Sequence, residues 1–124
     1  MIDPITEYIL LKENLELKTW TKFQKHPIWK QFRKDVYTDL SNRMNCDGKK
    51  DKAKRMCWYS YYIKAGEAEL KVVSKFGKKI CKDSFPKEKD KDRLQMCLRK
   101  IVPELIHNAK DDIQQAKRNR KEYG

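Results

Sequence analysis

The sequence predicts an all-α protein, a bundle of about four helices with a long C-terminal helix that is kinked or restarted at Pro103. Apolar residues recur at helical spacing in most of this 124-residue chain. Only four glycines and four prolines are present, and 39% of the residues are charged, which disfavours a β-sandwich or a low-complexity chain. We expect one helical domain over residues 1–124, divided into an N-terminal docking helix (1–27), a helical core (28–106) and a basic C-terminal helix extension (107–124).

The first predicted helix begins at Pro4, with Asp3 as its N-cap, and continues to Lys25. About half of its circumference is covered by apolar residues, namely Ile5, Tyr8, Ile9, Leu11, Leu15, Trp20 and Phe23. Leu10 and Leu17 lie on the opposite side of this helix, where a surface helix needs no apolar residues. Either the helix is held on both sides, or these leucines are exposed by chance, or the helix docks on another chain. Docking predicts a partner-binding surface of Ile5, Ile9, Leu10 and Leu17.

The second predicted helix covers residues 28–44, because His26 precedes a proline and interrupts the first helix. Its single apolar stripe consists of Trp29, Phe32, Val36, Leu40 and Met44. The Asn-Cys-Asp-Gly sequence at residues 45–48 is typical of a turn.

The central predicted helix covers residues 52–76 and ends near Gly77. Its apolar residues occupy two nearly opposite faces, so we expect neighbouring helices on both sides. Trp58, Tyr61 and Phe76 are then expected to be buried. Alternatively, the aromatic run stacks on nucleobases beside its basic neighbours. Residues 78–90 carry many charges around an isolated Ile80 and Phe85, and we expect a loop or short turn there.

The last predicted helix begins near Asp90 and keeps its apolar register through Pro103. Beyond Ile106 the apolar stripe is reduced to Ala, Ile and Ala. We expect so little apolar surface to be insufficient to hold the end of the helix, which predicts a neighbouring subunit that orders it.

The four cysteines, at positions 46, 57, 81 and 97, lack the C-x(2–4)-C spacing of a zinc site. Both histidines, His26 and His107, are isolated, so we expect no metal and no cofactor. Cys57 and Cys97 lie on apolar helix faces, where free cysteine commonly packs. We therefore expect free thiols, with one or two disulfides as the alternative.

No catalytic motif is present: the sequence lacks G-x-S-x-G, G-x-x-x-x-G-K-[ST], G-x-G-x-x-G and H-E-x-x-H. The only adjacent acids, Asp111 and Asp112, point about 100° apart on a helix. We therefore expect that this protein is not an enzyme. Mean hydropathy is −0.97, and no apolar run approaches the roughly 20 residues of a membrane span. We expect no membrane partner, no classical secretion signal, and a virion or cytoplasmic location.

Net charge is +12, concentrated in two clusters. The first consists of Lys71, Lys75, Lys78, Lys79 and Lys82, and the second of Lys117, Arg118, Arg120 and Lys121. Such clusters predict an acidic partner, either nucleic acid contacted through phosphates or an acidic protein surface. The alternative is ordinary solvated lysine on exposed helix faces.

Residues 1–10, MIDPITEYIL, resemble the N-terminal stretch of small virion-associated structural proteins of tailed bacteriophages. The resemblance implies a structural subunit whose N-terminal helix docks within a capsid, neck or tail assembly. We therefore expect a non-enzymatic structural or assembly subunit that binds other protein subunits. The alternative is a small basic nucleic-acid-binding protein.

Overall fold

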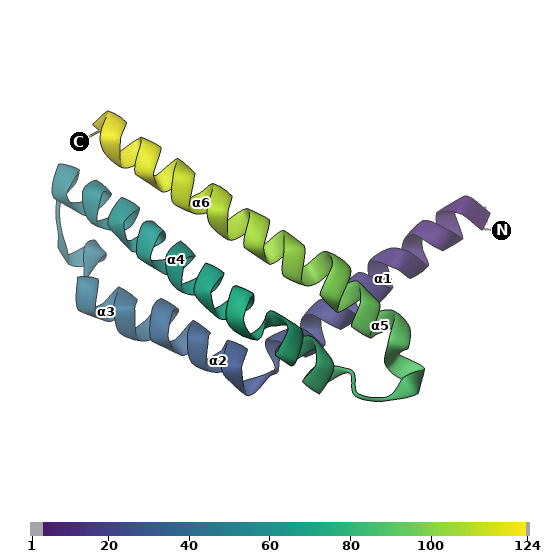
Figure 1. Cartoon of the computed structure of the whole chain (residues 1–124). Coiled ribbons are helices and arrows are strands. Elements are labelled where there is room, and N and C mark those ends of the chain that lie inside the picture. The colour runs from purple at the N-terminus through teal and green to yellow at the C-terminus, as the bar shows by residue number, and fades with distance from the viewer. Residues whose placement is uncertain (1–3, 124) are drawn as a thin grey trace.

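The computed structural model describes the backbone of residues 4–123 and the side chains of residues 14–123. Over these residues the fold is an all-α bundle without strands, as the sequence predicts. The described residues form four helical segments. The long helix α4 (Asp51–Ser84) lies between the second segment and the last (Figure 1). The last segment runs antiparallel to α4 and accounts for the predicted long C-terminal helix.

The first segment is α1 (Pro4–Gln24), whose N-terminal end projects away from the bundle (Figure 1). Its other end joins the core through Phe23, which is fully buried. Lys100 donates a hydrogen bond to Glu16 at 2.8 Å and ties α1 to the last segment. The predicted N-cap, Asp3, lies outside the described residues.

His26, which looks isolated in the sequence, joins the first two segments to α4. It is the N-cap of α2 (Pro27–Arg33), and its Nδ1 accepts a hydrogen bond from the Ile28 amide at 3.1 Å. Nε2 therefore carries the ring proton and donates to Asp83 Oδ2 at 2.9 Å. This hydrogen bond, followed by one from Lys79, holds the pKa of the Asp83 carboxyl below its ordinary value.

The second segment continues from α2 through the π-helical η1 (Lys34–Leu40) into α3 (Ser41–Met44), so the prediction of one helix over residues 28–44 is confirmed. The apolar stripe of this segment advances by four residues at each step from Phe32 to Met44, which drifts by about 40° per step around an α-helix. The wider turns of a π-helix offset that drift. Asn45, with a φ of 47°, ends the segment and begins the predicted turn, the 3-10 turn η2 (Cys46–Gly48).

Helix α4 is longer than predicted: the expected end near Gly77 and the expected loop over residues 78–90 are wrong. Ile80 is fully buried and Phe85 is 1% exposed, so both belong to the core. Gly77 is a site of close helix contact, since a Cβ there would lie 3.1 Å from the methyl groups of Val102. Only residues 85–87 are non-helical before the short η3 (Glu88–Asp90).

Both apolar faces of α4 are covered, one by the second segment and the other by the last segment. On one side, the Tyr61 hydroxyl donates a hydrogen bond to the Val36 carbonyl at 3.2 Å. Tyr61 is buried as predicted, but Trp58 and Phe76 are only half-buried at the edge of the core. Full burial is therefore wrong for those two, which pack against the core as partly buried side chains.

The last segment consists of α5 (Lys91–Met96), the π-helical η4 (Cys97–Ile101) and α6 (Val102–Tyr123). The helical path continues past Pro103, so the fresh start considered there does not occur. The irregularity expected near Pro103 takes the form of η4, whose wider turns end two residues before this proline, which lacks an N–H donor.

The apolar residues of α6 past Ile106 are buried by the chain itself, which corrects the expectation that they cover too little surface to hold this part of the helix. Ala109, Ile113 and Ala116 are at most 8% exposed. A Cβ on Gly66 of α4 would lie only 2.6 Å from Ile113 Cγ1, so the two helices approach closely. The close approach at Gly66 thus lets a short apolar stripe bury α6 as far as Ala116.

The expectation of free thiols is also wrong. Cys46 is bonded to Cys57, which joins the turn to the start of α4, and Cys81 is bonded to Cys97, which joins the end of α4 to η4. The second pair depends on the extension of α4, because that extension places Cys81 in the core opposite the antiparallel last segment. Disulfides persist mainly in oxidising environments.

Candidate functional site

The first surface candidate is an apolar hollow between α1 and α6, which we call the α1 hollow. Its volume is about 390 Å³, and it is lined by Glu16, Leu17, Trp20, Ile101, Glu104, Leu105 and Asn108. Leu17 is 62% exposed at this hollow. An exposed leucine beside an apolar depression is typical of a contact surface.

Of the four predicted partner-binding residues, only one has a side chain that the structure describes. Leu17 lies on the α1 hollow, whereas the side chains of Ile5, Ile9 and Leu10 are outside the described ones. Their backbone belongs to the projecting part of α1 (Figure 1). The predicted docking surface thus coincides with the segment that leaves the bundle.

The first basic cluster lies on α4, and all of its lysines are exposed. Because α4 continues to Ser84, four of them fall within about 60° of one another around the helix. These four, Lys71, Lys75, Lys78 and Lys82, are the α4 lysine stripe. Lys79 stands apart and pairs with Asp83 at 3.1 Å.

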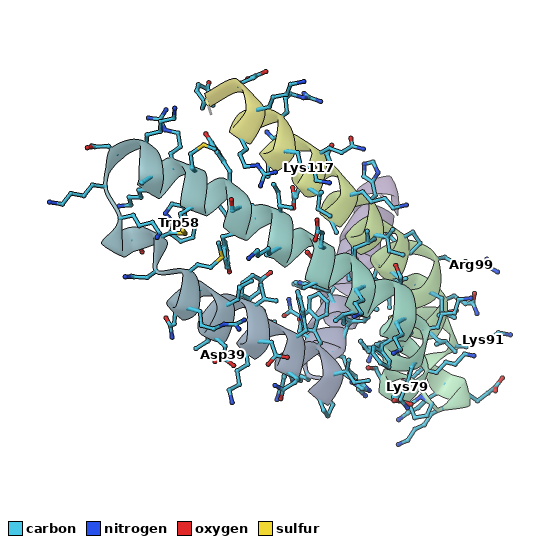
Figure 2. The ribbon with its side chains drawn as sticks, turned by 60° about the vertical axis from the view of Figure 1, so that its left-hand side comes forward. Asp39, Trp58, Lys79, Lys91, Arg99 and Lys117 are labelled. Atoms are coloured by element: carbon cyan, nitrogen blue, oxygen red, sulfur yellow. A yellow bond between two sulfur atoms is a disulfide. The ribbon has the colours of Figure 1, made fainter. Side chains whose placement is uncertain are left out.

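The second basic cluster, Lys117, Arg118, Arg120 and Lys121, is exposed near the end of α6. Since α4 and α6 are antiparallel, this cluster lies beside the start of α4, away from the α4 lysine stripe. Figure 2 shows Lys79 and Lys117 at opposite ends of the paired helices. The fold therefore keeps the two predicted clusters apart.

Another candidate site is a larger hollow between η1, α4 and α6, which we call the tyrosine pocket. Its volume is about 550 Å³. The lining residues are Tyr37, Tyr59, Tyr61, Tyr62, Ala65, Gly66, Glu69, Asp112, Gln115, Ala116 and Asn119. Among the described residues that line it, the charged side chains are two carboxylates, Glu69 and Asp112, on a chain whose net charge is +12.

The two carboxylates interact across the tyrosine pocket. Partial burial raises the pKa of Glu69, and the negative charge of Asp112 raises it further. Burial, followed by the charge of Glu69, raises the pKa of Tyr37. Because its pKa is raised on folding, Glu69 disfavours the folded state progressively as the pH rises above the ordinary value of 4.5. Among the described side chains, no base forms an ion pair with Glu69 or Asp112.

The tyrosine pocket was not predicted from the sequence. In the sequence, Glu69 resembles an ordinary surface acid with a lysine two residues away, and Asp112 is one of two adjacent acids on a helix. The available signal was the tyrosine-rich face of the central helix, which core packing explains equally well. Antiparallel pairing of α4 and α6 brings the two acids together.

Among the described residues, no three His, Cys, Asp or Glu side chains are grouped so that they could hold a metal ion. Within the same part of the chain, none of the helices has both the length and the apolar character of a membrane span. No protein-family model, curated protein or solved structure matches the chain.

Proposed function

We propose that this chain is a non-enzymatic structural or assembly subunit of a larger complex, and that α1 is its docking element. The observation that carries the proposal is the position of Leu17, which is 62% exposed beside the α1 hollow. The helix that presents it projects from the bundle (Figure 1). A projecting helix with apolar residues is a common element of protein–protein docking.

The more specific setting that we propose is a bacteriophage particle. Its support is the resemblance of residues 1–10 to small virion-associated proteins of tailed phages. The two disulfides favour a virion over the cytoplasm, because a particle leaves the reducing cytosol, whereas cytosolic disulfides are rare.

Replacing Leu17 with aspartate tests the docking function. Since the side chain is mostly exposed, the free energy of unfolding should change by no more than about 0.5 kcal/mol. A buried charge in the docked interface should instead reduce incorporation into the native complex about tenfold or more. Tagged chains expressed in the native host, followed by native mass spectrometry of the purified complex, measure this incorporation.

The matched control is Asn42→Asp, which adds the same charge at an exposed position of α3, far from α1. It should assemble like the unaltered chain. The double variant Leu10→Asp with Leu17→Asp should be at least as defective as Leu17→Asp while remaining helical by circular dichroism. Normal assembly of the double variant contradicts docking through α1, and unfolding of the isolated chain shows that these leucines are intramolecular.

A second candidate function is nucleic-acid binding through phosphate contacts, and the alignment of the α4 lysine stripe favours it. Four lysines along one exposed helix face can follow a phosphate backbone. Lysine supplies charge without the bidentate geometry of arginine, so sequence-independent contact is expected.

Salt dependence distinguishes this second candidate. If about five phosphates are contacted, the logarithm of the binding constant for duplex DNA should fall with a slope of about −4 to −5 against the logarithm of salt concentration. Replacing the four lysines of the α4 lysine stripe with glutamine should make that slope less negative by about 3 to 4. The control is to replace the four bases of the second basic cluster, which lies at the opposite end of the helix pair. This change should leave most of the slope intact. No binding at low salt excludes this function.

A further inference from the structure

The walls of the tyrosine pocket are aromatic and partly fixed in place. Tyr61 is held by its hydrogen bond to the Val36 carbonyl. Tyr37 and Tyr62 are each 49% exposed, so their rings are accessible. Tyr37 also contacts the ring of Phe32, and Tyr62 the ring of Trp58. Aromatic rings with an accessible face attract cations through their quadrupole, most strongly when the cation sheds its water.

The charge of the pocket is opposite to that of the whole chain. Glu69 and Asp112 lie on different helices, and neither pairs with a base among the described side chains. Glu69 is partly buried, and the negative charge of Asp112 makes ionisation of Glu69 less favourable. A bound cation relieves this repulsion.

Two cations of the chain already lie on rings around the pocket. The Arg33 guanidinium is 5.5 Å from the centre of the Tyr37 ring. On the other side, the Arg55 guanidinium is 5.6 Å from the centre of the Tyr123 ring, which stacks on Tyr59. The space between them is lined by further tyrosines and by the two acids.

An adjoining hollow extends the site toward α1 and α2. It shares Tyr37 and Glu69 with the tyrosine pocket, and its volume is about 380 Å³. Its wall includes Trp29, which is only 3% exposed. The indole N–H of Trp29 has no hydrogen-bond acceptor among the described residues. This adjoining hollow offers apolar surface and an unused indole donor, and its charged side chains are Glu69 and Arg33. The tyrosine pocket itself is lined by the two carboxylates and, among the described residues, by no base.

We propose that the tyrosine pocket binds an organic cation, an alkylammonium or guanidinium group, between its aromatic walls and its two carboxylates. Its volume lies within the range of about 300–1,000 Å³ that is typical of small-ligand sites. A metal ion fits less well, because hard cations require several oxygen ligands and retain their water. The cation comes either from a free small molecule or from a lysine or arginine side chain of a partner protein, since both present the same group.

Titration of the ¹⁵N-labelled chain with tetramethylammonium chloride, compared with sodium chloride at equal ionic strength, tests the proposal. Saturable amide shifts are expected for the residues that line the pocket and not for the lysine clusters. Removing one charge with Glu69→Gln or Asp112→Asn should weaken binding about tenfold. Removing one ring with Tyr62→Leu, at a half-exposed position, should weaken it several-fold.

The chain offers matched controls for both acids. Glu67→Gln and Asp111→Asn remove the same charge from the same helices at exposed positions that do not line the pocket. Both should bind like the unaltered chain, and thermal melts should show that every variant is folded. Equal loss in the variants and in their controls overturns the proposal, because it indicates only a general charge effect.

Two further titrations identify the source of the cation. Saturation by tetramethylammonium supports a free small molecule, whereas saturation only by the side-chain analogues acetyl-lysine methylamide or acetyl-arginine methylamide supports a partner's side chain. If none of these probes produces saturable shifts beyond those caused by sodium chloride, the proposal is wrong.

Discussion

Replacing Phe85 with alanine is expected to lower the free energy of unfolding by about 3–5 kcal/mol. The ring is 1% exposed and belongs to the core cluster directly after the end of α4, so its removal leaves a cavity that the surrounding helices can fill only in part. Urea denaturation followed by circular dichroism measures the loss. This is a large fraction of the stability of a typical small domain.

Phe76→Ala is the matched control, because it removes the same ring from a half-buried position on α4. We expect about half the loss of Phe85→Ala, in proportion to the smaller area that is buried. A loss below about 1 kcal/mol for Phe85→Ala would show that residues 85–87 form a surface loop, as the sequence alone suggested.

Removing the Cys81–Cys97 disulfide with a double alanine substitution should cost about 3 kcal/mol. The bond closes a loop with a sequence separation of 16, and the loss corresponds to the extra freedom of the unfolded chain. Both cysteines are fully buried, and alanine avoids placing an unpaired hydroxyl in the core. Chemical denaturation of both chains under non-reducing conditions measures the difference.

Treatment with a reducing agent provides the control. It should destabilise the unaltered chain more than the double variant, which retains only the Cys46–Cys57 bond. Titration of thiols after non-reducing denaturation should find none in the unaltered chain. Four reactive thiols in that measurement would contradict both disulfides.

The sequence by itself determined the helical class and the first two helical segments. The stripe from Trp29 to Met44 and the break at His26-Pro27 are local signals, and the structure keeps both. Of the predicted partner-binding side chains, the structure describes Leu17 alone, and it is exposed. Such features depend on neighbours a few residues apart, which periodicity records directly.

Only the tertiary structure decided how far α4 extends, how the cysteines pair and what holds α6. Gly77 resembles a helix end locally, yet it lies inside α4 at a close contact with Val102, where a side chain would be crowded. Packing between distant segments overrides local propensity, and no local pattern records it. The tyrosine pocket has the same origin, because Glu69 and Asp112 share a site only after α4 and α6 pair in antiparallel register.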